Sequence, residues 1–144
     1  MQSRQAALVL GIVLIILGVL ALIPGVTVAP RVDAPPLHWH AGYGYFLGLF
    51  PTNVLLNFLR IALGIGGVVC SLRLLWARGY LRVMTVVTFA AVWFGIIPGL
   101  RTLGGFMPLY GNEVWFHLVL LAIVAFYDLG WAVKIGESPD FSNA

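Results

Sequence analysis

Four long apolar segments dominate the pattern of hydrophobic and polar positions along the chain. They span approximately residues 6–23, 54–76, 80–100 and 114–133. Each suits a membrane helix, since about 20 helical residues cross a hydrocarbon core about 30 Å thick. Membrane β-strands would instead alternate between apolar and polar residues. The pattern therefore predicts an all-α fold, a four-helix transmembrane bundle that forms one domain over residues 1–144.

Composition and charge narrow the class of protein. Of 144 residues, 61% are hydrophobic and 9% are charged, and the mean hydropathy is +1.01, whereas ordinary soluble domains carry roughly 25% charged residues. This excludes a water-soluble fold and makes the lipid bilayer the expected surroundings. The net charge of +3 comes from residues beside the apolar segments. Nucleic-acid binding would need a basic stripe on a solvated face, so no nucleic-acid partner is expected.

Positively charged residues predict how the helices are oriented, because short loops rich in lysine and arginine stay on the cytoplasmic side. One side of the predicted bundle carries Arg4, Arg73, Arg78, Arg82 and Lys134. The opposite loops hold Arg31 and Arg101. We therefore expect a multi-pass protein of the cell membrane with both termini cytoplasmic, a long exterior loop at 25–52 and a poorly ordered polar tail at 136–144.

The two halves of the chain are similar to each other. Ala-Leu-Ile-Pro-Gly-Val at 21–26 corresponds to Gly-Ile-Ile-Pro-Gly-Leu at 95–100, and each is followed by a loop that leads to an asparagine and a new helix. Since each half would cross the membrane and return, this internal repeat predicts two parallel in-out-in helical hairpins. Arg60 and His117 then take comparable places just inside the second and fourth helices.

The helix starts that follow these asparagines carry a resemblance to a known family. Asn-Phe-Leu-Arg-Ile-Ala-Leu-Gly at 57–64 and Asn-Glu-Val-Trp-Phe-His-Leu at 112–118 resemble domain-of-unknown-function family 4383. The resemblance implies a small four-helix protein of the bacterial inner membrane and carries no established activity. The family's pattern places a histidine at both helix positions, and this chain departs from it at Arg60. A more distant likeness to DoxX-type membrane proteins implies a redox-associated subunit.

Small residues at helical spacing predict a packing seam on each of the first two helices. The two stripes consist of Ala7, Gly11, Gly18, Ala21 and Gly25 in the first helix and Gly64, Gly67 and Ser71 in the second. Such seams let membrane helices approach closely.

A group of polar residues near the predicted exterior face is the best candidate in the sequence for a functional site. Asn53, Asn57 and Arg60 continue the stripe of the second helix outward, and Arg60 lies about 10 Å inside the helix start. Glu113 and His117 share one face of the fourth helix at i and i+4. If the hairpins pack together, these groups converge. A structural ion pair, an anion or ligand site, and proton transfer are all open interpretations.

Metal and cofactor chemistry find little support in the sequence. His38 and His40 are candidate metal ligands, but a His-x-His loop has many other uses and no cysteine accompanies it. No metal site and no cofactor are therefore expected. Asp128 would pair with Arg73, Arg78 or Arg82 near the cytoplasmic end, with a proton-relay carboxylate as the alternative interpretation.

Two classes of function follow. The first is a non-enzymatic structural or accessory component of a membrane complex, with a membrane-protein partner or a second copy of the chain. The second is a binder or transporter of a small lipophile or ion anchored at Arg60, with a DoxX-like redox-associated subunit as a variant. A cavity lined by Arg60 and His117 would favour the second class, and a filled interior the first.

Overall fold

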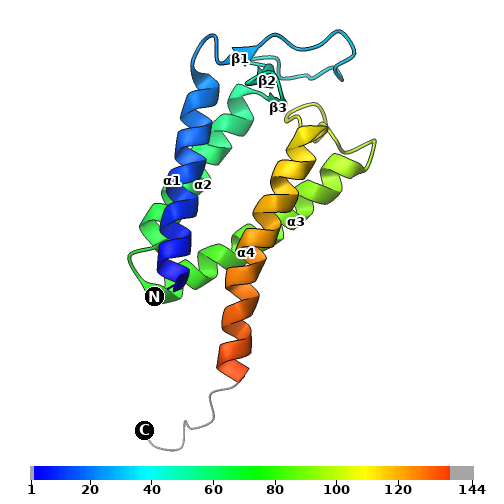
Figure 1. The fold of residues 1–144 in the computed structure, drawn as a ribbon. Helices are drawn as coiled ribbons and strands as arrows, with labels where there is room; N and C mark the ends of the chain where they lie inside the picture. The colour runs from blue at the N-terminus through cyan, green and yellow to red at the C-terminus, as the bar shows by residue number, and fades with distance from the viewer. Residues whose placement is uncertain (1, 137–144) are drawn as a thin grey trace, which may run out of the picture.

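Four helices make up most of the computed structural model, which describes residues 2–136 of the chain and side chains up to residue 130. They are α1 (Gln2–Leu22), α2 (Val54–Cys70), α3 (Leu74–Ile96) and α4 (Asn112–Gly136) (Figure 1). The predicted all-α class is confirmed. Three of the helices, α1, α3 and α4, are long and apolar enough to cross a membrane, and α2 is apolar but shorter at 17 residues. The predicted tail lies outside the described residues, apart from its first residue.

The second connection lies earlier than the sequence predicted. The turn occupies 71–73 rather than 77–79, so the predicted end of the second helix at 76 and the start of the third at 80 are wrong. Hydrogen bonds between residues three apart, as in a 3₁₀-helix, end α2. They run from the Leu72 N–H to the Val69 carbonyl (3.2 Å) and from the Arg73 N–H to the Cys70 carbonyl (3.3 Å). Arg73 is then extended, with φ −128° and ψ 135°, before α3 begins.

The helices form two antiparallel hairpins, α1 with α2 and α3 with α4, and α3 leans across to contact the first hairpin (Figure 1). The two predicted stripes of small residues are packing seams, and the structure shows that they pack against each other. A Cβ placed on Gly11 would lie 2.6 Å from the Gly64 carbonyl oxygen, and one on Gly64 would lie 2.6 Å from the Gly11 carbonyl oxygen. The two backbones therefore touch where only glycine fits. Gly25 lies beyond α1 and takes no part in the seam.

A hydrophobic core joins the hairpins in the half of the bundle near the N-terminus. Its buried members are Ala7, Leu10 and Leu14 of α1, Ala77, Tyr80, Leu81 and Met84 of α3, and Leu120 and Val124 of α4. The Tyr80 hydroxyl also donates to the Leu63 carbonyl of α2 (3.0 Å). One core therefore holds all four helices together.

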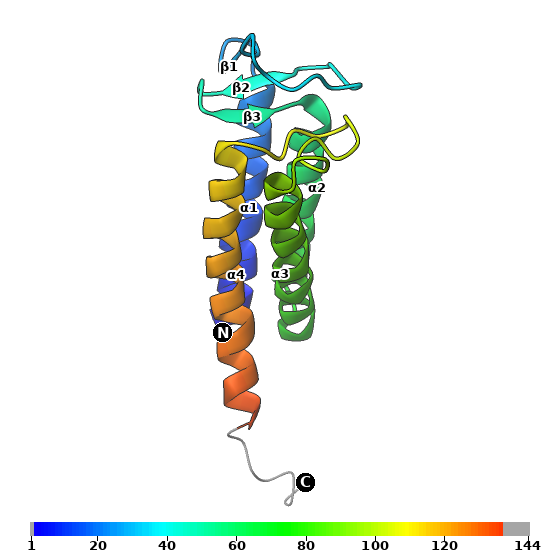
Figure 2. The same ribbon diagram turned by 90° about the vertical axis from the view of Figure 1, so that its right-hand side faces the viewer.

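A small antiparallel sheet covers the helix ends opposite the N-terminus (Figure 2). Its strands are β1 (Thr27–Val28), β2 (Gly44–Phe46) and β3 (Phe50–Thr52), in the order β1-β2-β3. Val28 pairs with Tyr45, and Tyr45 with Pro51. The sequence predicted only a loop at 25–52, because strands of two or three residues show no alternating pattern.

The two loops at this end are bonded to each other. The backbone N–H groups of His38 and Trp39 both donate to the Gly105 carbonyl, at 2.8 and 3.2 Å. The Asn112 side chain donates to the Leu49 carbonyl (3.1 Å). We refer to residues 23–53 and 97–111 together as the cap.

Candidate polar site beneath the cap

An ion pair links the two hairpins directly under the cap. Arg60 Nη2 of α2 lies 2.6 Å from Glu113 Oε2 at the start of α4, and the two side chains are only 8% and 1% exposed. Buried charges are stable only when paired and hydrogen-bonded, which explains why these two residues find each other. The convergence predicted from the sequence is confirmed.

The remaining groups of Arg60 are directed at neighbours in the same cluster. Nη1 donates to Asn57 Oδ1 (3.0 Å) and lies 3.4 Å from Thr52 Oγ1. The Thr52 hydroxyl itself donates to Asn57 Oδ1 (2.9 Å). The guanidinium carbon lies 5.5 Å from the centre of the Phe116 ring, and Nε is buried without a hydrogen-bond partner. Asn57 is therefore the acceptor that orients the arginine toward Glu113.

Asn53 belongs to the predicted set, but it contributes to the fold instead of contacting Arg60. Its side-chain oxygen accepts from the Leu56 N–H (2.9 Å), which makes it the N-cap of α2. Its amide nitrogen donates to the Phe106 carbonyl in the second loop of the cap (2.6 Å). Asn53 is fully buried. Its side chain both caps the start of α2 and joins that helix to the second loop of the cap.

His117 lies beside Glu113. Its Nδ1 is 2.7 Å from the Glu113 carbonyl oxygen and 3.7 Å from Glu113 Oε2. A carbonyl oxygen can only accept, so Nδ1 carries the proton in this contact. The ring also meets Phe116 edge-on, with 5.5 Å between centroids. The histidine therefore stabilises the first turn of α4 and the carboxylate.

The charged groups of this cluster are almost fully buried. An outer cavity of about 300 Å³ between the end of α1, β1 and the start of α2 is lined by Asn57, but not by Arg60, Glu113 or His117. Cavities of about 450 and 390 Å³ lie toward the opposite end of the helices. None of these three cavities in the described part of the chain opens onto the ion pair.

The two histidines of the first loop make contacts within the cap. The ring of His38 packs against Gly105, where an added Cβ would overlap it. His40 is exposed, and its carbonyl accepts from the Tyr43 N–H (3.0 Å). Within the described residues no group of three or more histidine, cysteine or carboxylate side chains could hold a metal ion. Asp128 was expected to pair with an arginine, and its Oδ1 lies 3.6 Å from Arg82 Nε.

Sequence reasoning missed a cluster of three tyrosines in the cap. The Tyr43 hydroxyl donates to the Pro35 carbonyl (2.8 Å), so the Tyr110 hydroxyl is the donor in the 2.5 Å contact between the two phenols. The hydroxyl of Tyr45 lies 3.4 Å from that of Tyr110. Burial, followed by the two phenolic hydrogen bonds, raises the pKa of Tyr110 well above its ordinary value. Burial also raises the pKa of Tyr43, against the opposing effect of the bond from Tyr110.

The sequence analysis also did not identify Thr52 and Phe116 as site residues, although both contact Arg60. A threonine just before an N-cap and an aromatic residue among apolar ones are common, so only the position of Arg60 could have singled them out.

Comparison with known proteins identifies the family. The profile of a domain of unknown function, DUF4383, matches residues 4–131. No curated protein and no solved structure matches the chain, so the likeness to DoxX-type proteins stays an expectation. The matched region includes the parts of the four helices between residues 4 and 131, the cap and the whole polar cluster. The chain therefore belongs to the DUF4383 family.

Proposed function

We propose that this protein is a structural or accessory component of a membrane complex and acts by presenting a rigid cap to a partner. The observation that carries the proposal is the closed polar cluster. The ionic groups of Arg60 and Glu113 are bonded to each other and to Asn57, and no cavity described above reaches them. A site that turns over or transports a substrate needs access to its charged groups. Here those groups lock α2 to α4.

The cap that this lock supports has features of a contact surface. Large apolar side chains are exposed on it: Val32, Trp39, Leu47, Leu49 and Phe106. Exposed apolar and aromatic residues on loops held by a rigid scaffold are typical of protein contact sites. The Asn53 bond to Phe106 and the His38 bond to Gly105 hold both loops in place.

The proposal includes the orientation in a bacterial cell membrane, with four membrane crossings and both termini in the cytoplasm. Figure 1 places the N-terminus and the turn between α2 and α3 at the same end, and that turn carries Arg73. Cysteine labelling tests this orientation in a variant without Cys70. An impermeant reagent should label a cysteine at Val32, which is fully exposed in the cap, and should not reach one at Leu72. The reverse pattern would contradict the orientation.

Purification from the native host in a mild detergent tests the accessory role. Mass spectrometry should find one protein in constant ratio to the tagged chain, or a second copy of the chain. Trp39→Ala should reduce that ratio, because Trp39 is half exposed on the cap. Trp115→Ala is the matched control, since Trp115 is equally large and is exposed on α4.

A different pattern would favour the alternative function. If no protein co-purifies, and a small lipophile or an anion is retained by the wild type but lost from Arg60→Leu, the polar cluster is a binding site and the proposal is wrong.

A further inference from the structure

The outer cavity, of about 300 Å³, lies between the end of α1, β1 and the start of α2. It forms where the chain leaves α1 at Pro24 and returns as β1, and the Thr27 hydroxyl holds β1 to the helix by donating to the Ala21 carbonyl (2.8 Å). In the described part of the chain no charged side chain lines this cavity. Its apolar walls include Leu22, Ile23, Val28 and Val54.

One buried donor faces the outer cavity without a partner. Asn57 lines the cavity and is only 1% exposed. Its Oδ1 accepts from Arg60 and Thr52, neither of which lines the cavity. Arginine can only donate, so its contact fixes which end of the amide is the oxygen. The other end, Nδ2, therefore points toward the cavity, and it makes no hydrogen bond with the described part of the chain.

The chemistry of the walls restricts what can bind there. The hydroxyl protons of Thr27 and Tyr43 are already used, on the Ala21 and Pro35 carbonyls, so a polar group that enters should be an acceptor for Nδ2. An anion would be buried without a counterion, because no cation lines the described cavity. A carbonyl oxygen fits best, since it accepts and needs no acceptor of its own.

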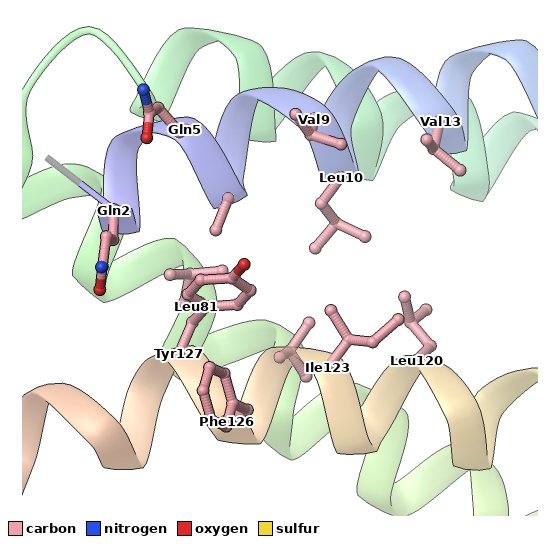
Figure 3. A pocket seen from close by; sticks show the side chains of 12 residues that line it. Gln2, Gln5, Val9, Leu10, Val13, Leu81, Leu120, Ile123, Phe126 and Tyr127 are labelled. Atoms are coloured by element: carbon pink, nitrogen blue, oxygen red, sulfur yellow. The ribbon is translucent and has the colours of Figure 1, made fainter.

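The larger cleft between α1 and α4 has no comparable group (Figure 3). Val9 and Leu120 lie on its two sides. Its glutamines, Gln2 and Gln5, are exposed, and no polar side chain that lines it in the described chain is buried. Water can bond to exposed amides, whereas a buried donor without a partner costs stability. The unbonded amide of Asn57 therefore distinguishes the outer cavity as a binding site.

We propose that the outer cavity binds a small neutral molecule through a carbonyl oxygen, which accepts a hydrogen bond from Asn57 Nδ2 while the rest of the molecule contacts the apolar walls. The space corresponds to about ten groups the size of a water molecule, whose share of liquid volume is about 30 Å³. Two sources carry this chemistry, namely a free ketone, ester or amide and the fatty-acid ester of a neighbouring lipid. The site is separate from the contact surface proposed above, and either can exist without the other.

Photolabelling with acetophenone tests the site. The purified protein is reconstituted in vesicles of a dialkyl ether phosphatidylcholine, which has no ester carbonyl, and irradiated with acetophenone, whose excited carbonyl forms a bond with nearby C–H groups. We expect adducts concentrated on Val28 and Val54. At equal membrane concentration, cyclohexyl methyl ketone should compete about fivefold better than isopropenylcyclohexane, which has a CH₂ group in place of the oxygen. Fivefold is about the effect of one hydrogen bond.

Two substitutions test the donor and the cavity separately. Asn57→Asp keeps an oxygen for Arg60 and removes the free N–H groups, so labelling should fall about fivefold or more. Ala29→Trp should reduce labelling severalfold by filling the mouth of the cavity, because Ala29 is exposed and lines it. This variant leaves the polar cluster untouched and gives the result if Asn57→Asp fails to fold. Val32→Trp is the matched control, since Val32 is fully exposed and does not line the cavity.

Repeating the labelling in ester-linked phosphatidylcholine identifies the source of the carbonyl. Weaker labelling than in the ether lipid means that the lipid ester fills the cavity, and equal labelling means that a free molecule does; both agree with the proposal. The proposal is wrong if the alkene competes as well as the ketone, or if Asn57→Asp is labelled like the wild type, because the cavity then holds only water or hydrocarbon. Adducts spread evenly over the exposed apolar positions would also overturn it.

Discussion

Removing one partner of the Arg60–Glu113 pair should destabilise the protein more than the energy of a surface ion pair would suggest. Arg60→Leu leaves the Glu113 carboxylate, which is 1% exposed, without its bonded cation, and His117 Nδ1 lies 3.7 Å from Glu113 Oε2. Stranding a buried charge in this way costs about 3–5 kcal/mol. Glu113→Gln keeps the shape and an acceptor for Arg60, and should cost about 1.5–3 kcal/mol, the range for a hydrogen bond to a charged group.

The double variant provides the decisive measurement. Arg60→Leu combined with Glu113→Gln removes both charges, so its loss of stability should fall short of the sum of the single losses by about 1–3 kcal/mol. Unfolding in mixed detergent micelles, followed by the fluorescence of the five tryptophans, would give the free energies. Lipid content should be measured on each variant.

The Arg82–Asp128 pair is a matched control. The two groups are 3.6 Å apart and the arginine side chain is 71% exposed, so the same cycle with Arg82→Leu and Asp128→Asn should give coupling below about 1 kcal/mol. If the Arg60 and Glu113 losses add to within about 0.5 kcal/mol, the two residues are energetically independent and the lock between the hairpins does not exist.

Three further predictions concern the cap and the helix seam. Asn53→Ala should cost about 1–2 kcal/mol, because it removes the N-cap of α2 and strands the Phe106 carbonyl; the exposed Asn112→Ala should cost under about 0.5 kcal/mol in the same unfolding assay. Gly11→Val should lower stability by about 1–3 kcal/mol, and thermal melts should show almost no such loss for Gly79→Val, which has open space around it. Stability should be complete below the ordinary tyrosine pKa of 10.0 and should fall at higher pH, because the folded state raises the pKa of Tyr110; Tyr110→Phe should flatten this fall, and an unchanged profile would contradict it.

The helices and the convergence of Arg60 with Glu113 could be predicted because each follows from a strong constraint. Long apolar runs have few other ways to fold, and an arginine and a glutamate near the same ends of such runs stabilise each other when buried. The glycine seam followed from spacing alone, since Gly11 and Gly64 permit a backbone contact that a larger residue prevents.

Other features depend on contacts that a linear pattern does not contain. The turn at 71–73 has neither glycine nor proline, and the apolar residues Leu74 to Trp76 hid it. The strands are too short for a period, and Pro51 within β3 argued against any strand. Gly44 indicated no special feature in the sequence, yet its position in β2 leaves no room for a Cβ beside the Val28 carbonyl. Such close approaches become visible only when the partner strand is known.

The separation of Arg60 from Glu113 along the chain has a consequence for biosynthesis. The two residues are 53 positions apart, and at ribosomal rates of about 5–20 residues per second the glutamate is added roughly 3–10 seconds after the arginine. In the membrane arrangement proposed above, α2 therefore leaves the ribosome with a charge that has no counterion. We expect the insertion machinery to retain this helix, or the helix to stay at the bilayer surface, until α4 is made. Nascent chains stalled before Glu113 should then be extracted from the membrane more readily than chains stalled after α4.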